Sequence, residues 1–211
     1  MARGRVIAVD GPAASGKGTL ARRLAAHYRL NFLDTGLLYR AAAARLLGAG
    51  GEPHDAVAAE AAALSLDPSD LKRADLREER VSQAASIVAA HQPVRTALLK
   101  YQRAVGRTLP GAVLDGRDIG TVVFPDAEAK LFVTASLEVR ALRRVKQLRE
   151  KSNKAIESRV LAEIKERDAR DGSRAVAPLK PADGALVIDT TDLDADEVFH
   201  QAVRFIDSKG G

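Results

Sequence analysis

Residues 5–19 read Arg-Val-Ile-Ala-Val-Asp-Gly-Pro-Ala-Ala-Ser-Gly-Lys-Gly-Thr, an apolar run that leads straight into a glycine-rich turn. The run Val6–Val9 predicts a buried strand, and the residues from Lys17 onward predict a helix. Three glycines in the turn leave room for backbone N–H groups to converge on an anion. They are Gly11, Gly16 and Gly18. The alternative is a strand–turn–helix without a ligand, but strand, turn, lysine and helix together favour a phosphate-binding loop.

The side chains of this loop suit a nucleoside triphosphate bound with Mg²⁺. Lys17 brings a cation to the β- and γ-phosphates, and Thr19 brings a hydroxyl group for the metal. Gly18 stands between them, and this ending resembles the loops of nucleoside monophosphate kinases more than those of GTPases or motor ATPases. The candidate ATP-binding residues are Gly11, Pro12, Ala13, Ala14, Ser15, Gly16, Lys17, Gly18 and Thr19.

The composition predicts a single domain with an aliphatic core. The 211 residues are 46% hydrophobic but only 4% aromatic, and they include no cysteine. Disulfides and thiolate metal sites are therefore excluded, and the cytoplasm is the expected location. No apolar run approaches membrane-spanning length, and Asp10 interrupts the first one, so neither a membrane partner nor a secretory leader is expected.

The excess positive charge is concentrated in one segment. The net charge is +5, and residues 140–174 hold twelve Lys or Arg against six Asp or Glu. Such a segment could bind nucleic acid through phosphate contacts, or it could clamp a nucleoside triphosphate during a reaction. The chain has only three Tyr and five Phe with which to stack bases, which disfavours a nucleic-acid partner.

Strand-like and helix-like segments alternate along the chain. The predicted strands are residues 5–10, 31–33, 112–115, 129–133 and 185–189. The predicted helices are residues 17–28, 37–47, 55–66, 75–90, 94–105, 137–151, 156–171 and 194–208, the last opening with a capping box. Short strands that are apolar on both faces predict an α/β fold with a three-layer, doubly wound, five-stranded parallel sheet. Ligands bind at the carboxyl ends of such strands, so the chemistry is expected just after Asp10, Leu33, Asp115 and Asp189.

Two polar clusters follow predicted strands. After the second strand, Thr35 is expected to cap a helix, and Arg40 suits bidentate recognition of a phosphate. After the third strand, Asp115 is placed to hold Mg²⁺ through water, Arg117 to grip a phosphate, and Asp118 to accept hydrogen bonds from the amino group of a base. The alternatives are a helix cap with a surface arginine, and a turn whose charges satisfy one another.

A third cluster, in residues 166–174, is rich in arginine. Spacings of three and four put its charged residues largely on one side of a helix: Arg167, Arg170, Asp171 and Arg174. Gly172 is expected to end or hinge this helix. Mobile arginine-rich segments over a phosphate loop act as lids that exclude water and bring cations to a transferring phosphoryl group. A helix laced with ion pairs is the alternative.

Two stretches resemble the bacterial cytidylate kinases, and the similarity extends over nearly the whole chain. They are Asp-Gly-Arg-Asp-Ile-Gly-Thr-Val-Val-Phe-Pro-Asp-Ala at 115–127 and Ile-Lys-Glu-Arg-Asp-Ala-Arg-Asp-Gly-Ser-Arg-Ala-Val-Ala-Pro-Leu at 164–179. The resemblance implies one P-loop kinase domain, 1–211, with ATP in the loop and CMP or dCMP opposite. It implies a core at about 1–36, 106–150 and 180–211, a helical monophosphate-binding lobe at about 37–105 and a helical lid at about 151–179.

The same resemblance assigns roles to single residues. Arg40 and Arg117 match ligands of the monophosphate. Positions that read the pyrimidine and its surroundings match Thr35, Ser86, Arg95 and Asp118, of which Ser86 and Arg95 are singled out by the resemblance alone. Lid residues that close on the acceptor match Arg167, Asp171 and Arg174, with the sugar hydroxyls near Asp171. The family usually carries a β-rich insertion before the helix with Ser86, and residues 67–80 are interpreted as a shortened form of it.

The expected reaction is transfer of the γ-phosphoryl group of ATP to CMP or dCMP, with Mg²⁺ as cofactor. The expected catalytic residues are Lys17, Arg117, Arg167 and Arg170, and the expected metal ligands are Thr19 and Asp115. The chain is expected to act as a monomer without nucleic acid. The alternatives are a kinase for UMP, AMP or a shikimate-like acceptor, and a P-loop ATPase that binds nucleic acid.

Overall fold

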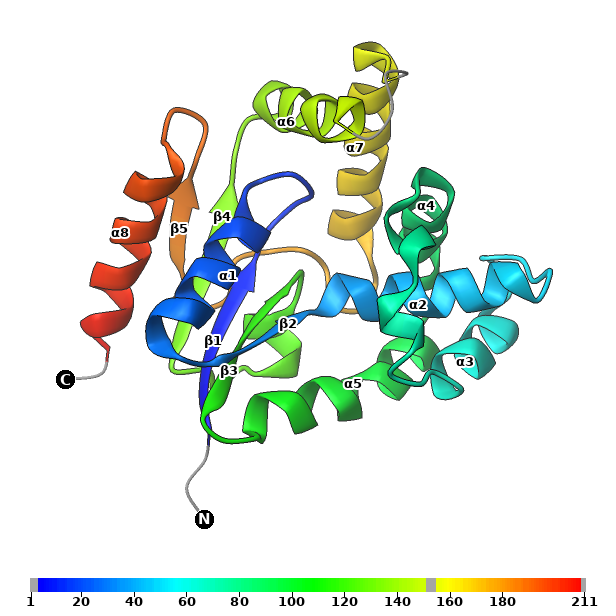
Figure 1. The fold of residues 1–211 in the computed structure, drawn as a ribbon, viewed down its shortest axis with the longest axis horizontal. Coiled ribbons are helices and arrows are strands. Elements are labelled where there is room, and N and C mark those ends of the chain that lie inside the picture. Colours follow the sequence, from blue (N-terminus) through cyan, green and yellow to red (C-terminus); the bar gives the residue numbers. More distant parts are fainter. Residues whose placement is uncertain (1–3, 151–154, 210–211) are drawn as a thin grey trace.

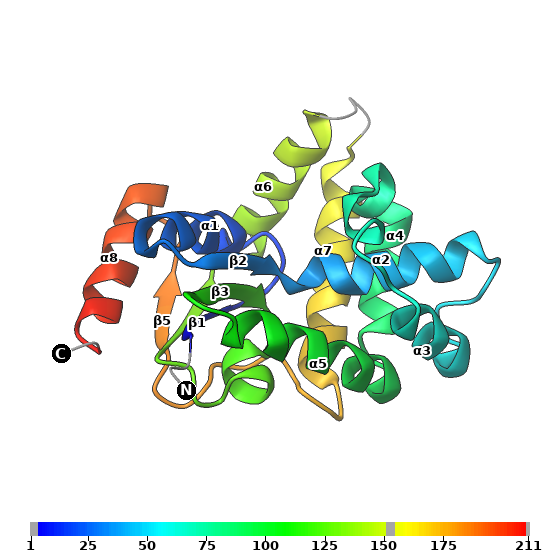
Figure 2. The ribbon, with the colours of Figure 1, turned by 60° about the horizontal axis from the view of Figure 1, so that its bottom comes forward.

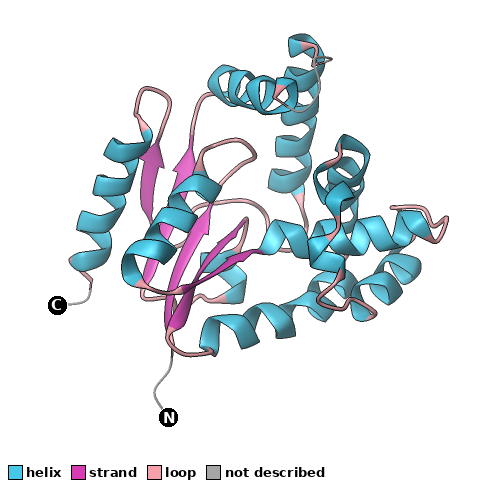
Figure 3. Ribbon diagram, in the orientation of Figure 1, coloured by secondary structure: helices cyan, strands magenta, loops and turns pink. Residues whose placement is uncertain are grey.

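The computed structural model describes residues 4–150 and 155–209, and its centre is a five-stranded parallel sheet (Figure 1 and Figure 3). The strands are β1 Arg5–Asp10, β2 Asn31–Asp34, β3 Gly111–Gly116, β4 Ala129–Thr134 and β5 Leu186–Asp189. They lie in the order β2-β3-β1-β4-β5, and every neighbouring pair is parallel. The predicted parallel α/β sheet is confirmed, and the strand before the glycine-rich loop lies at its middle.

Helices cover both faces of the sheet. The side chains of β1 alternate between the two faces and are apolar on both, so each face must be covered. The helices of the described residues are α1 Lys17–Tyr28, α2 Thr35–Gly48, α3 Ala56–Leu64, α4 Glu79–Val88, α5 Gln92–Arg107, α6 Leu137–Arg149, α7 Glu157–Ser173 and α8 Ala195–Asp207. Ile7 and Val9 share one buried cluster with residues of α1 and α8. Val6 and Ala8 point to the other face and share a cluster that includes residues of α5.

Two further groups of helices stand beside the sheet. In the first, α2, α3 and α4 pack through small side chains that let the helices approach closely: Ala42, Ala43, Ala59, Ala62, Ala63, Ala84 and Ala85. In the second, α6 and α7 pack through Ala141, Val145, Val160 and Ile164. Figure 2 shows that α7 lies alongside α4, so the two groups meet over the carboxyl edge of the sheet.

The helix predicted at 75–90 begins only at Glu79. Arg73 and Glu78 take extended backbone angles, so the residues before α4 form two short 3₁₀ turns, Asp70–Lys72 and Ala74–Arg77. The segment predicted to carry a shortened insertion, residues 67–80, therefore contains turns and the start of α4 but no strand.

One predicted helix cap is wrong, and one element was missed. Gly172 lies one residue before the end of α7 at Ser173, and a hinge at Gly172 stays a prediction. Thr35 is not a cap but the first residue of α2, whose N-cap is Asp34. A π-helical turn, Ile119–Val123, follows β3 and has no periodic signal in the sequence.

The boundaries predicted for core, lobe and lid stay predictions. Residues 1–3, 151–154 and 210–211 of those predicted ranges, including the predicted end of a helix at 151, lie outside the described residues. Within the described ranges, no helix is both long enough and apolar enough to cross a membrane.

The predicted capping box at the start of α8 is present and generates a stability prediction. Asp194 accepts from the N–H groups of Asp196 and Glu197, and the Glu197 carboxylate accepts from the N–H of Asp194. Asp194→Ala is expected to lower Tm by about 3 °C, measured by thermal denaturation at pH 7, because two N–H groups lose their acceptor.

The matched control for this variant is Asp192→Ala, at an exposed position just before the cap, with an expected shift below about 1 °C. The backbone N–H groups of Glu197 and Asp196 lower the pKa of Asp194. The difference between wild type and Asp194→Ala is therefore expected to shrink as pH falls below the ordinary carboxyl pKa of about 4. Equal Tm values at pH 7 would contradict the prediction.

Candidate active site

The loop between β1 and α1 has a backbone that only small residues allow. Gly11 has φ 151°, and a Cβ there would lie 2.0 Å from the carbonyl oxygen of Val133 on β4. Gly16, at the N-cap of α1, has φ 91° and offers no side chain to cap the helix. The first N–H groups of α1 are therefore left without a side-chain acceptor, as an anion-binding helix start requires.

Lys17 and Asp115 form a buried ion pair at the carboxyl edge of the sheet. The Lys17 Nζ lies 3.2 Å from the Asp115 Oδ1. The pairing of Val9 with Asp115 in the β1–β3 register brings the end of β3 beside the phosphate loop. Burial lowers the pKa of Lys17 and raises the pKa of Asp115, and the charge of each partner opposes the other's shift.

Thr19 and Asp115, the predicted pair of metal ligands, line different cavities, and their role as metal ligands stays a prediction. Thr19 is exposed and lines a separate cavity of about 340 Å³. Gly18 is the residue that faces Asp115, since a Cβ there would lie 2.9 Å from the Oδ2 of that carboxylate. In the described residues no group of three or more His, Asp or Glu is arranged to hold a metal ion.

Thr190, the residue just after the end of β5, lines the cavity beside Thr19. Asp189 is exposed and accepts hydrogen bonds from Thr191. Thr190 instead donates its hydroxyl to the carbonyl oxygen of Ser15 at 3.0 Å, and Arg143 donates to Thr190 at 2.8 and 2.7 Å. The chain after β5 therefore supports the phosphate loop through a threonine.

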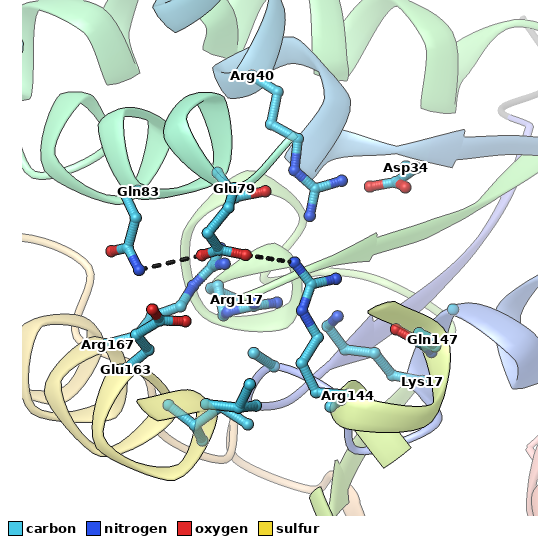
Figure 4. Close-up of a pocket in the computed structure, with 16 residues that line it drawn as sticks. Lys17, Asp34, Arg40, Glu79, Gln83, Arg117, Arg144, Gln147, Glu163 and Arg167 are labelled. Carbon is cyan, nitrogen blue, oxygen red and sulfur yellow. Dashed lines mark hydrogen bonds and ion pairs between the residues drawn. The ribbon is translucent and has the colours of Figure 1, made fainter. Parts of the chain in front are cut away.

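A cavity of about 190 Å³ in front of Lys17 gathers cations from several elements (Figure 4). They are Lys17 of α1, Arg40 of α2, Arg117 after β3, Arg144 of α6 and Arg167 of α7. Burial and the nearby Arg117 lower the pKa of Arg167 to about 9, and burial also lowers the pKa of Arg40. Lys17, Arg117 and Arg144 are ion-paired with Asp115, Asp171 and Glu79. Among the described residues, the buried Nε atoms of Arg40 and Arg167 have no hydrogen-bond partner, so an anion could accept from them.

Glu79 supplies part of the counter-charge in this cavity. Its carboxylate accepts from Arg144 at 2.9 Å and from Gln83 at 3.0 Å, so it joins α4 to α6. Figure 4 shows these two contacts among the cations of the cavity. The sequence carried no spacing signal for Glu79 or Arg144, because they come from different helices and meet only in the folded chain.

A second cavity, of about 100 Å³, adjoins the first and shares Lys17, Arg40, Arg117 and Arg167 with it. Its other polar lining includes Tyr39, Ser86, Arg95, Asp118, Asp171 and Arg174. Arg95 forms a buried ion pair with Asp118 and lies over the Tyr39 ring, 5.8 Å from the ring centroid. The cavity thus offers a fixed carboxylate and guanidinium pair at one end and the shared cations at the other.

Asp171 gathers three arginines at the boundary between the two cavities. Its carboxylate contacts Arg117 at 2.9 Å, Arg167 at 4.0 Å and Arg174. Burial by itself would raise the pKa of Asp171, but these three guanidinium groups outweigh it and lower the pKa. Asp171 is therefore a carboxylate that orients arginines.

Two predicted site residues have other contacts in the structure. Thr35 is buried, donates its hydroxyl to the carbonyl oxygen of Asp115 at 2.8 Å, and lines neither cavity. Arg170 also lines neither: it contacts Ser86 Oγ and Gln83 Oε1 at 3.2 Å, and Glu166. The helical spacing put Arg170 on the same side as Arg167, but its side chain bridges α7 to α4.

Arg140 is a buried residue that the sequence did not single out. It donates to Asp168 of α7 at 2.6 and 3.1 Å, to Ala135 O at 3.0 Å and to Ala13 O of the phosphate loop at 3.4 Å. One side chain therefore joins α6, α7 and the loop. Its position at the start of α6, one turn after β4, was the signal available in the sequence.

The crowding of cations generates a prediction about anions. Tripolyphosphate is expected to raise the Tm of the wild-type protein, because it can accept from the unpartnered Nε–H groups of Arg40 and Arg167 and binds only the folded state. In Arg167→Gln most of this rise in Tm should disappear. The Tm without anion should not fall, because the substitution removes a buried positive charge that lies close to other positive charges. Thermal-shift measurements with and without tripolyphosphate test both parts.

Arg159→Gln, at an exposed position on the same helix, is the matched control and should keep the full response to the anion. The prediction fails if Arg167→Gln responds to tripolyphosphate as the wild type does and is less stable without it.

Comparison with known proteins agrees with the resemblance found in the sequence. The family model described as cytidylate kinase matches residues 7–208. A cytidylate kinase of Paramagnetospirillum magneticum is 58% identical over 97% of this chain and 98% of its own length. One of Methylocella silvestris is 55% identical over 96% and 94%. These relatives are matched over nearly their full lengths, so they carry no long insertion that this chain lacks.

Solved structures with low sequence identity share the fold. An uncharacterized protein from Eubacterium ventriosum has a TM-score of 0.58 at 16% identity, covering 97% of this chain and 99% of that one. A gluconokinase from Sinorhizobium meliloti has a TM-score of 0.50 at 15% identity, covering 98% and 93%. The match of the family model over most of the chain, with relatives above 50% identity, shows that this protein belongs to the cytidylate kinase family.

Proposed function

We propose that the protein transfers the γ-phosphoryl group of ATP to CMP or dCMP, releasing ADP and CDP or dCDP. The observation that carries the proposal is the pair of adjoining cavities that share Lys17, Arg40, Arg117 and Arg167. One cavity opens onto the phosphate loop, and the other ends at Asp118. Two nucleotides bound with their phosphates toward the shared cations would face each other for in-line transfer.

The donor site is proposed to be the loop from Gly11 to Thr19 with the cavity of about 340 Å³ beside Thr19. The triphosphate would lie along the loop N–H groups, with Lys17 at its β- and γ-phosphates. Thr19 would then face the donor nucleotide in that cavity and not the metal. Arg143 and Thr190 would form the wall of the same cavity.

The acceptor site is proposed to be the smaller cavity, with the monophosphate on Arg40, Arg117 and Arg167. Asp118 offers a carboxylate that accepts from the exocyclic amino group of cytosine, which uracil lacks. Ser86 lines the same cavity, and Asp171 with Arg174 would meet the sugar hydroxyls.

Asp115 fits a magnesium ion held through water together with nucleotide phosphates. It is a buried carboxylate whose Oδ2 faces Gly18, where a Cβ would lie 2.9 Å away, and Mg²⁺ in kinases is bound by one or two carboxylates plus substrate phosphates. When bound, the ion would neutralise charge on the phosphates. Lys17 holds the carboxylate in place at 3.2 Å and would itself neutralise the transferring group.

The chemistry needs no strong general base. The attacking atom is an oxygen of the acceptor phosphate, which is largely ionised near neutral pH. Catalysis would therefore consist of positioning and charge neutralisation by Lys17, Arg117 and Arg167. Arg170, which contacts α4 and not the cavities, would act by holding α7 against α4.

We also propose that the enzyme works as a monomer in the cytoplasm and without nucleic acid. The absence of cysteine supports a reducing compartment. The arginines of α6 and α7 that line the cavities support a nucleotide as the partner of the basic segment.

The proposed activity is tested by ADP release in a coupled assay with CMP, dCMP, UMP and AMP as acceptors. CMP and dCMP should be phosphorylated with the highest kcat/KM. Lys17→Ala should lose about 3 kcal/mol of transition-state stabilisation, more than about a hundredfold in kcat, because one preorganised cation is removed. If the enzyme prefers AMP or UMP, CMP is not its acceptor. Near-normal turnover by Lys17→Ala would refute the catalytic role of the loop.

Asp118→Asn is expected to reduce the discrimination between CMP and UMP. The amide keeps the shape but removes one acceptor and the charge that pairs with Arg95, so KM for CMP should rise by about tenfold while KM for ATP stays within about twofold. Steady-state kinetics with both acceptors measure this. Asp126→Asn, at an exposed position eight residues further on, is the control, and an unchanged CMP to UMP ratio in Asp118→Asn would contradict the prediction.

A further inference from the structure

Asp10 is a buried carboxylate that joins the strand of the phosphate loop to the segment after β3. It is the last residue of β1 and is 4% exposed. Its Oδ1 accepts the N–H of Ile119 at 2.8 Å, and its Oδ2 accepts the N–H of Gly120 at 2.8 Å. One side chain thus satisfies two consecutive buried backbone donors from a distant part of the sequence. Asp10 lines neither of the two nucleotide cavities.

The two N–H groups follow Asp118 directly, so Asp10 holds the backbone that carries the Asp118 carboxylate. On the other side of the same peptide, the carbonyl oxygen of Asp118 accepts from Val122 at 2.9 Å and Val123 at 3.2 Å. The Asp118 side chain pairs with Arg95. Backbone and side chain of Asp118 are therefore held by different partners, and the Asp10 carboxylate ties this backbone to the phosphate-loop strand by hydrogen bonds.

The contact requires a carboxylate. Two N–H donors need two acceptor oxygens, and an aspartate offers both. An asparagine would offer one oxygen and would turn an NH₂ group toward the second donor. The segment has little space in which to adjust, because a Cβ at Gly120 would already lie 3.2 Å from Ala182 and 3.4 Å from the Lys130 side chain. A buried donor without an acceptor would have to be relieved by displacing the backbone.

We propose that Asp10 is a positioning residue for the acceptor: by holding the N–H groups of Ile119 and Gly120, it sets where Asp118 stands against the base of the bound monophosphate. The inference rests on the proposed function, since it takes the cavity at Asp118 as the acceptor site. It adds a physical link between the donor strand and the acceptor pocket. A displacement of Asp118 would weaken recognition of the base without removing any group that contacts it.

The test compares Asp10→Asn and Asp10→Ala with the wild type, using the monophosphate that the wild type phosphorylates best. Asp10→Asn should raise KM for that acceptor by about tenfold, with kcat and KM for ATP within about twofold, because one of two buried donors loses its acceptor. Asp10→Ala should raise it further. Asp189→Asn is the matched control and should leave KM unchanged. Asp189 ends β5 as Asp10 ends β1, but in the part of the chain that the structure describes its side chain accepts hydrogen bonds from its neighbour Thr191 and not from the segment after β3.

Amide hydrogen exchange gives a readout without turnover. In Asp10→Asn the amides of Ile119 and Gly120 should exchange faster, while that of Ile7 in β1 stays protected. If Asp10→Asn does not fold, amide exchange is measured on the wild-type protein with each nucleotide. The acceptor monophosphate should slow exchange at Ile119 and Gly120, and ATP should not.

Three results would overturn the inference. They are a variant that loses thermal stability with an unchanged acceptor KM, a variant in which KM rises equally for ATP and the acceptor, and wild-type amides at 119 and 120 that do not respond to the acceptor. A wild type that prefers a monophosphate other than CMP or dCMP would refute the proposed substrate but leave this comparison valid.

Discussion

The pairing of β1 with β3 is the constraint on which the rest of the site depends. Its register sets Val9 opposite Asp115 and Asp10 opposite Gly116, so the two strands end at the same level. The phosphate loop therefore emerges beside the segment that carries Arg117 and Asp118. Without this register Lys17 would not lie 3.2 Å from Asp115. Parallel strands converge their carboxyl ends on one edge, which makes that edge the place for chemistry.

A second constraint is the accumulation of cations at this edge. Five cationic side chains from different elements line one cavity, and burial lowers the pKa of Lys17, Arg40 and Arg167. Such crowding costs stability in the absence of an anion, because desolvation and like charges disfavour the charged forms. Asp171 and Glu79 reduce the cost by pairing with the arginines. The folded protein therefore has a preformed site whose positive charge favours the binding of phosphates.

Much of the fold was predictable because periodic apolar residues and glycines report local conformation. The apolar run before Gly11, the glycines and Lys17 predicted the central strand and the loop, and both are present as expected. The capping box at Asp194 was readable because its partners are three residues apart. The π-helical turn after β3 was not, since two of its N–H groups are bound by Asp10 of β1, more than a hundred residues away in the sequence.

The sequence by itself determined the parallel α/β class, the position of the phosphate loop, and the residue types that gather at the strand ends. Only the tertiary structure decided which of these residues share a cavity. Helical spacing grouped Arg170 with Arg167, and the loop motif assigned Thr19 to the metal, yet Arg170 bridges to α4 and Thr19 lines a separate cavity. The reason is that periodicity determines which residues share one face of a helix. What that face contacts depends on how helices distant in the sequence pack together.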